Sequence, residues 1–183
     1  MKFIQTGIEG AYLVEPTVIA DGRGEFFRTF DEMLFADAGL KKKFVQHNHS
    51  INYKKGTWRG FHYQLPPTAE TKLVRCVNGR IFDIVLDLRK DSETFLQWKG
   101  FELSAENKNQ LLIPEGCAHG FITLEDQSEL TYHHTMFYTP GYEGGIRHDD
   151  PRLKLKLPAS IEIISERDQS FNFITDEFKG IAL

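Results

Sequence analysis

A histidine and a lysine ten residues apart are the side chains in this sequence best suited to chemistry. His62 closes the segment Trp58-Arg-Gly-Phe-His62, and Lys72 opens the run Lys72-Leu-Val-Arg-Cys-Val. A lone histidine in a β-rich core is more often structural than catalytic. Two cations that face a cavity are costly, however, unless an anion binds between them. Arg59 and Lys72 therefore favour a catalytic or anion-binding site in this stretch.

Three arginines and two further side chains could join this site. Arg23, Arg59 and Arg167 could grip a diphosphate, because a guanidinium matches phosphate oxygens with two parallel hydrogen bonds. Tyr132 lies within an expected strand, and Asp168 follows Arg167 in an expected turn. A strand tyrosine is usually a packing residue with one polar end, and an Arg-Asp pair usually belongs to a surface turn. Each of these residues is weak evidence by itself.

Three other histidines could bind a metal ion. His119 lies in Pro114-x-Gly-x-x-His119-Gly, which is half of a cupin metal pattern. His47 and His49 could form the other half, since residues two apart on a strand share a face and imidazole binds transition metals. The glycine that should precede this pair and the glutamate that should follow it are missing. A metal-dependent cupin therefore stays only as an alternative.

The elements that must position these residues are mostly short strands bounded by turns. One helix is expected over residues 31–40, with Asp31 as N-cap and Gly39 as stop signal. Asn78-Gly79 is typical of a two-residue hairpin turn between the strands 72–77 and 80–89. His62 and Lys72 are expected on neighbouring strands. The expected strands are the stretch around His62 and residues 11–19, 25–30, 44–53, 72–77, 80–89, 98–103, 110–113, 118–124, 129–138 and 161–164, and residues 140–151 are expected to be a loop.

Many short strands with one helix predict an all-β sandwich or barrel. The antiparallel jelly roll of the cupins (the double-stranded β-helix) is the most economical choice, with the short helix near residues 31–40 and an irregular C-terminal tail. Its interior is a cavity that can hold a small ligand. No repeat, low-complexity tract or linker divides the chain, so we expect one jelly-roll domain over residues 1–183.

Composition narrows the function further. The 183 residues are 40% hydrophobic and 26% charged, with a formal net charge of −4. That balance argues against a nucleic-acid binder, which normally carries a basic stripe. No stretch resembles a signal peptide or is long enough to span a membrane. Two cysteines are a weak argument for secretion, so a reducing cytoplasm is the expected location.

Taken together, the motifs resemble the dTDP-4-dehydrorhamnose 3,5-epimerase family over most of the chain. The resemblance is specific because the motifs are many and occur in order. The matching stretches are Arg23-Gly-Glu-Phe-Phe, Gln46-His-Asn48-His-Ser50, Trp58-Arg-Gly-Phe-His62-Tyr-Gln64, Lys72-Leu-Val-Arg, Gly79-x-x-Phe-Asp83, Asp87-Leu-Arg89, Ser92-x-Thr-Phe, Trp98-x-Gly, Leu103-Ser-x-Glu-Asn107, Ile113-Pro-x-Gly-x-Ala-His119-Gly-Phe, Tyr132, Asp150-Pro-x-Leu and Ser165-x-x-Asp168.

The resemblance implies a jelly-roll homodimer, often with N-terminal strands exchanged between subunits. It implies catalysis without a metal or a nucleotide coenzyme. The implied substrate is a nucleotide-linked 4-keto-6-deoxyhexose, whose carbons 3 and 5 both lie next to the carbonyl and can each lose a proton to give an enolate. The implied product feeds a surface polysaccharide, and no nucleic-acid or membrane partner is expected.

Four catalytic roles follow from the resemblance. The resemblance implies that His62 is the general base and that Asp168 orients it. Histidine suits this role because it titrates near the working pH. Lys72 is expected to stabilise the enolate oxygen, and Tyr132 to return a proton on the opposite face. The implied substrate contacts are Arg23, Phe26, Gln46, Asn48, Arg59, His119, Tyr138, Glu143 and Arg167, with Tyr138 expected to stack on the base.

The chain departs from the family pattern around the two ends of the substrate. Aspartate is usual where this chain has His47, glutamate where it has Arg28, and tryptophan where it has His148. A basic residue usually follows Tyr132, where His133-His134 stands, and Gly144-Gly145 is unusual. The reaction type is therefore better founded than the substrate. A single-site epimerase or a ketoisomerase acting on a CDP- or GDP-linked sugar stays as the alternative, and retention of Tyr132 favours epimerisation.

Overall fold

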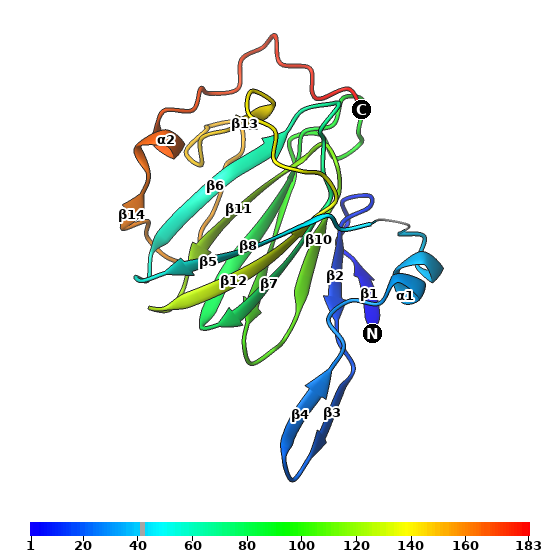
Figure 1. Ribbon diagram of the computed structural model, residues 1–183. Helices are drawn as coiled ribbons and strands as arrows, with labels where there is room; N and C mark the ends of the chain where they lie inside the picture. Colours follow the sequence, from blue (N-terminus) through cyan, green and yellow to red (C-terminus); the bar gives the residue numbers. More distant parts are fainter. Residues whose placement is uncertain (41–42) are drawn as a thin grey trace.

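Two β-sheets packed face to face form the body of the molecule (Figure 1). The computed structural model describes residues 1–40 and 43–183. The first sheet has the order β1-β2-β10-β7-β12-β5. Its strands are β1 (Lys2–Gln5), β2 (Tyr12–Glu15), β10 (Gln110–Ile113), β7 (Lys72–Asn78), β12 (Ser128–His134) and β5 (Gln46–Asn52).

The second sheet has the order β13-β6-β11-β8-β9, with β14 added in parallel to β6. Two strands that belong to neither sheet, β3 and β4, pair as a hairpin that extends away from the body (Figure 1). These strands are β13 (Glu143–Gly145), β6 (Thr57–Gln64), β11 (Cys117–Thr123), β8 (Arg80–Asp87), β9 (Trp98–Ser104), β14 (Ile163–Ile164), β3 (Val18–Asp21) and β4 (Gly24–Phe27).

The turn at Asn78-Gly79 is not the hairpin that the sequence predicts. Strand β7 pairs with β10 and β12, whereas β8 pairs with β9 and β11, so the chain crosses here from one sheet to the other. Only Gly79 has a positive φ, of 71°, whereas a type I′ turn needs two such residues. His62 on β6 belongs to the second sheet and Lys72 on β7 to the first, so the two residues lie on opposite sheets and not on neighbouring strands.

Several strand boundaries also differ from the predictions. The predicted strand 11–19 is divided into β2 and β3, because Pro16 has no N–H to donate to a ladder. The predicted strand 129–138 ends at His134, where its partner β5 begins at Gln46. The predicted loop 140–151 contains β13, which pairs with the edge of β6.

The helix predicted over residues 31–40 is confirmed as α1 (Glu32–Asp37). The Asp31 side chain accepts hydrogen bonds from the backbone N–H groups of Met33 and Leu34. Phe35 is 1% exposed and packs among Phe3, Phe30 and Phe44 over the outer face of the first sheet. A second, unpredicted helix of one turn, α2 (Glu166–Gln169), begins after Ser165, whose hydroxyl accepts from the Asp168 N–H. Neither helix in the described part of the chain is long and apolar enough to cross a membrane.

Apolar side chains form one core between the two sheets and another on the outer face of the second sheet. The interior core contains Val74, Val85, Leu111, Phe121 and Leu130, all 2% exposed or less. The irregular C-terminal segment covers the outer face of the second sheet and supplies Leu153, Ile174 and Ile181 to a second core. Between these layers the strands are held firmly enough to fix the side chains of a site.

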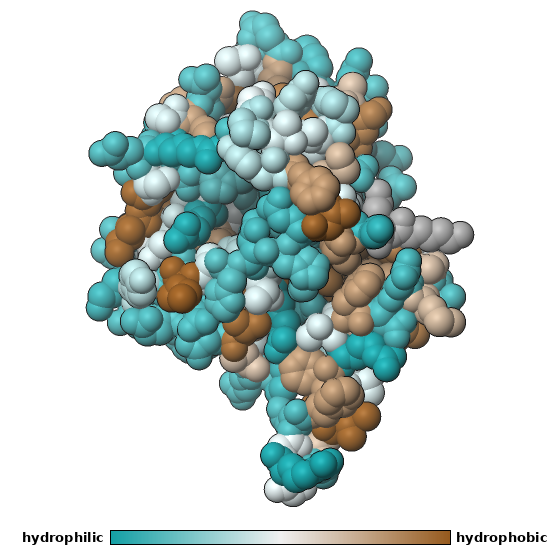
Figure 2. Space-filling view, in the orientation of Figure 1, coloured by the Kyte–Doolittle hydropathy of each residue, from teal (hydrophilic) through white to brown (hydrophobic). Residues whose placement is uncertain are grey.

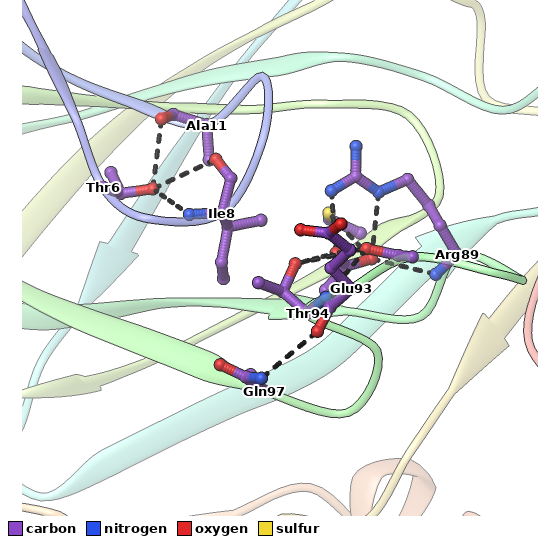
Figure 3. A network of polar contacts seen from close by, with 10 residues as sticks. Thr6, Ile8, Ala11, Arg89, Glu93, Thr94 and Gln97 are labelled. Atoms are coloured by element: carbon purple, nitrogen blue, oxygen red, sulfur yellow. Dashed lines mark hydrogen bonds and ion pairs between the residues drawn. The ribbon is translucent and has the colours of Figure 1, made fainter.

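A buried carboxylate organises the loop that follows β8. Asp87 is fully buried, and its oxygens accept hydrogen bonds from the side chains of Arg89, Ser92 and Thr94 (Figure 3). Burial raises the pKa of this carboxyl, but these hydrogen bonds outweigh it and bring the pKa down to about 2. The nearby Thr6 hydroxyl closes the turn between β1 and β2 by donating to the Ala11 carbonyl. The Asp87 contacts therefore order the loop through a group that stays ionised.

Candidate active site

A polar cavity of about 270 Å³ opens between the two sheets. Its walls come from β5, β6, β7, β11 and β12, so both sheets contribute. The lining residues are Asn48, His49, Ser50, Arg59, His62, Lys72, His119, Phe121, Tyr132 and His134.

A β-bulge brings Arg59 and His62 to the same cavity although they are three residues apart. In the pairing of β6 with β11, His62 lies opposite His119 and Arg59 opposite Phe121, so β6 has one extra residue between them. Gly60 in the bulge has a φ of +136°, and an added Cβ would lie 2.5 Å from Gly120 Cα. Only glycine fits this backbone.

His62 and Asp168 form the first of three histidine–carboxylate pairs at the cavity. Asp168, 3% exposed, lies in α2, and its Oδ1 is 2.8 Å from His62 Nε2 while its Oδ2 accepts from the Gly60 N–H at 3.0 Å. Burial would raise the pKa of Asp168, but these hydrogen bonds bring it below its usual value. Because the carboxylate accepts from Nε2–H, His62 Nδ1 is the nitrogen that can act as a base.

The electrostatic environment keeps His62 neutral. Burial lowers the pKa of His62 below its ordinary value, and the attraction of Asp168 for the imidazolium offsets this only in part. Lys72 and His119 disfavour the charged form further. A neutral, oriented imidazole in a cavity is the state that a general base requires.

Lys72 and Tyr132 face the same cavity from the first sheet. Lys72 is 7% exposed, and its Nζ lies 3.4 Å from Glu70 Oε1 and 3.3 Å from the His62 carbonyl oxygen. The Tyr132 hydroxyl lies 2.9 Å from Ser50 Oγ. Burial raises the pKa of Tyr132 well above its ordinary value, so the phenol keeps its proton at neutral pH.

The second histidine–carboxylate pair lies beside the first, at the inner wall of the cavity. His119 Nε2 is 2.5 Å from Asp83 Oδ1, and the His119 ring contacts the ring of Tyr132 with centroids 6.0 Å apart. Asp83 is fully buried on β8. The contact with Asp83 thus fixes the orientation of the His119 ring, which can contact a ligand bound in the cavity.

Several predicted substrate contacts surround the mouth. Tyr138 donates its backbone N–H to Gln46 Oε1 at 3.0 Å and its hydroxyl to Glu143 Oε1 at 3.0 Å. Gln46 in turn donates to Asn48 Oδ1 at 3.3 Å. Arg167 lines an adjoining hollow of about 340 Å³ that shares Arg59 and His62 with the cavity.

Arg23 and Phe26, two further predicted contacts, lie away from the cavity of their own chain. Both lie on the protruding hairpin, where Phe26 is 69% exposed and Arg23 Nη2 is 2.6 Å from Asp21 Oδ2. Figure 2 shows apolar surface along this hairpin and a polar tip. Val18 and Ile19 are also exposed there.

The metal alternative finds no support in the geometry. His47 packs against His133 with ring centroids 4.2 Å apart, and His49 Nε2 is 2.9 Å from Glu129 Oε2. His119 is paired with Asp83 instead. Within residues 1–40 and 43–183, no group of three or more His, Cys, Asp or Glu side chains could hold a metal ion.

Sequence reasoning missed the residues that contact the predicted site residues. Glu70, Asp83 and Ser50 contact Lys72, His119 and Tyr132, yet none was a candidate. Glu70 could have been noticed because it stands two residues before Lys72. Asp83 and Ser50 carry no such local signal, because their partners are distant in the sequence.

Comparison with known proteins shows which family the chain matches. The dTDP-4-dehydrorhamnose 3,5-epimerase family model matches residues 5–176. The chain is 46% identical over 169 residues to the dTDP-4-dehydrorhamnose 3,5-epimerase of Shigella flexneri, covering 92% of this chain and 93% of that one.

Solved structures show the same fold. The Bacillus anthracis dTDP-4-dehydrorhamnose 3,5-epimerase with TDP and PPi bound superimposes with a TM-score of 0.92 at 38% identity, covering 94% of this chain and 99% of that one. The Legionella pneumophila 3,5-epimerase in complex with dTDP-4-keto-L-rhamnose gives 0.89 at 36% identity, covering 94% and 92%. The all-β cupin jelly roll expected from the sequence is confirmed. The chain therefore belongs to the dTDP-4-dehydrorhamnose 3,5-epimerase family.

Proposed function

We propose that this protein epimerises a nucleotide-linked 4-keto-6-deoxyhexose at carbons 3 and 5, with dTDP-4-dehydro-6-deoxyglucose as substrate. The observation that carries the proposal is the placement of His62, held by Asp168 of α2, and of Tyr132 on opposite sheets of one cavity, which Lys72 also lines. An epimerase needs a base on one face of the sugar and an acid on the other. The named activity of the Shigella flexneri relative supports the assignment.

The reaction begins with proton transfer to His62. Its Nδ1 takes the proton from the carbon beside the carbonyl, and the electron pair of that C–H bond moves to form an enolate with its charge on the carbonyl oxygen. The Lys72 ammonium stabilises this oxygen, since a preorganised cation in a buried site acts strongly on developing charge. The Asp168 carboxylate stabilises the imidazolium that forms.

Reprotonation from the other face inverts the carbon. The Tyr132 hydroxyl gives its proton to the enolate carbon, and the electron pair of the enolate forms the new C–H bond. His62 then releases its proton, Tyr132 regains one, and the enzyme returns to its starting state. No redox step occurs, so these proton transfers need neither an oxidant nor a reductant.

The remaining groups bind the nucleotide. Arg59 and Arg167 would hold the diphosphate in the hollow that they share. Tyr138 would stack on the base, and Gln46, Asn48 and Glu143 would contact the nucleoside. His119 would contact the sugar.

A homodimer would complete the site. Arg23 and Phe26 lie too far out on the β3–β4 hairpin to line their own cavity, but the apolar hairpin could reach the cavity of a second copy. We further propose a cytoplasmic location, because Cys76 and Cys117 are free and buried and burial raises both pKa values to about 12, which leaves them unreactive thiols.

The test is incubation with dTDP-4-keto-6-deoxyglucose in deuterated water, followed by NMR. Deuterium at carbons 3 and 5 is the expected result. Deuterium at one carbon would restrict the activity to a single-site epimerase. Absence of label from a folded protein would refute the proposed substrate, and the CDP- and GDP-linked sugars would be tested next.

A further inference from the structure

A third histidine–carboxylate pair lies at the cavity and has no part in the steps above. His134 Nδ1 is 2.7 Å from Glu70 Oε2, and both residues are only 9% exposed. Burial raises the pKa of Glu70, but the hydrogen bond with His134 and the charge of Lys72 outweigh it and bring the pKa below its ordinary value. Glu70 is therefore an ionised carboxylate shared by two partners.

The hydrogen bonds that lead from His134 to the mouth have only one consistent direction. The backbone N–H of Tyr138 can only donate, so the Gln46 atom that faces it must be Oε1. Gln46 Nε2 then donates to Asn48 Oδ1, which turns Asn48 Nδ2 toward His134. His134 Nε2, 3.3 Å away, must accept this bond.

That direction fixes the proton on His134. Because Nε2 accepts from Asn48, the hydrogen lies on Nδ1 and is donated to Glu70 Oε2. The other carboxylate oxygen, Oε1, faces Lys72 Nζ at 3.4 Å. Directed hydrogen bonds thus lead from Tyr138 through Gln46, Asn48 and His134 to Glu70, and an ion pair continues from Glu70 to Lys72.

We propose that His134 and Glu70 are positioning residues that orient the Asn48 and Gln46 amides for the nucleotide and hold the ammonium of Lys72 at the carbonyl. The proposal rests on the proposed function for the identity of the ligand. His134 is suited to this task because a neutral imidazole is both a donor and an acceptor. One network would thereby contact both ends of the substrate. Its nucleotide half runs from His134 through Asn48 to Gln46. Its reacting half is the contact of Glu70 with Lys72, and substitutions can test each half separately.

The nucleotide half is tested with His134→Leu, which removes both the acceptor for Asn48 and the donor to Glu70. The amide then loses its fixed orientation, and we expect the affinity for dTDP alone, measured by calorimetry, to fall about tenfold. KM should rise similarly, and kcat should fall less than in Glu70→Gln, because Glu70 keeps its contact with Lys72 but loses the hydrogen bond from His134. His134→Gln restores one acceptor and one donor and should recover most of the affinity.

The reacting half is tested with Glu70→Gln. The amide can still accept from His134, but it no longer offers Lys72 a negative charge. We expect kcat to fall about tenfold with dTDP affinity close to that of the wild type. His133→Leu is the matched control, because His133 is next to His134 but packs against His47 on the outer face of the sheet.

Equal dTDP affinity of His134→Leu, His133→Leu and the wild type would overturn the proposal. So would a failure of His134→Gln to recover affinity in a protein that melts like the wild type, because the loss would then be one of packing. Failure of the proposed function is distinguishable from both. A wild type that binds dTDP without turning over the keto sugar would refute the epimerase assignment, and the dTDP affinities would still decide the role of His134.

Discussion

His62 and Tyr132 each contact a polar partner that orients the side chain, whereas burial sets the protonation state of both. Asp168 holds His62 from one side, and Ser50 contacts the hydroxyl of Tyr132. Burial keeps His62 neutral and Tyr132 protonated. At one pH, His62 can therefore accept a proton on one face of the sugar while Tyr132 can donate one on the other.

The loss of kcat/KM at acid pH should have its midpoint below pH 6.5. Only neutral His62 can accept the substrate proton, and burial lowers its pKa below the ordinary value of 6.5. As pH falls through that lowered pKa, the base becomes protonated and kcat/KM declines. Proton exchange measured between pH 4 and 8 tests this, and a midpoint above 6.5 would contradict it. Asp168→Asn removes the charge that favours imidazolium, so its midpoint should move to still lower pH.

Tyr132→Phe should separate exchange from inversion. His62 still removes the proton, so label from deuterated water should still enter the substrate. Inversion at the carbon that needs this acid should slow by about two to four powers of ten. NMR reads both quantities in one sample, with the exposed Tyr53→Phe as control and His62→Asn, which should abolish exchange, as the second reference. Unchanged inversion in Tyr132→Phe would make the tyrosine a packing residue.

At the scale of elements, the bulge in β6 decides which side chains meet. Strand alternation alone would send Arg59 and His62 to opposite faces. The extra residue at Gly60 and Phe61 returns both to the cavity. The backbone of this bulge also donates to Asp168, so one local irregularity both aims the base and anchors its carboxylate.

Gly60→Ala should be strongly destabilising. Its φ of +136° disfavours any side chain, and the new Cβ would lie 2.5 Å from Gly120 Cα and 2.8 Å from the His119 carbonyl oxygen. We expect a loss of about 3 kcal/mol or more in the free energy of unfolding, measured in urea. Gly22→Ala is the control, because nothing lies within 4 Å of its Cβ, and it should change stability by about 0.5 kcal/mol or less. Equal stability of the two variants would show that the bulge can relax.

At the scale of the whole molecule, the β3–β4 hairpin stands out because its own chain leaves large apolar side chains exposed there. It carries Ile19, 63% exposed, and Phe26, 69% exposed, away from the body. Apolar side chains on an extended arm favour burial against another protein surface. The proposed partner is a second copy, in which each arm would bring Arg23 and Phe26 to the cavity of the other subunit.

A mixed dimer tests this arrangement. Subunits with Arg23→Ala and Phe26→Ala are co-produced with subunits carrying His62→Asn, each inactive by itself. If arms act on the partner's cavity, half of the dimers contain one complete site, and about a quarter of wild-type activity per dimer should return. Light scattering after size-exclusion chromatography checks the dimer mass. No recovery in a confirmed mixed dimer would mean that each arm serves its own subunit.

The sequence by itself determined the class of fold, the capped helix at Asp31, and the motifs around His62 and Lys72 that carry the family resemblance. These are local features: strand alternation, capping and turn residues act over a few neighbours and can be recognised without the fold. Even so, the tight turn predicted at Asn78-Gly79 proved to be a crossover between sheets. Local turn chemistry indicates that a chain bends and does not indicate which strand it pairs with next.

Only the tertiary structure decided which residues meet in the cavity. Glu70 contacts His134 across 64 positions of sequence, and Asp168 contacts His62 across 106. The first of these contacts was not anticipated from the residues at all, and the second was expected only through the family resemblance. Such pairs arise because strand pairing sets β12 beside β7 and because α2 packs against β6, and burial then strengthens the hydrogen bonds between the polar groups that meet. The sequence supplied the polar side chains, and the pairing of strands distant in the sequence, together with the placement of α2, gave them their partners.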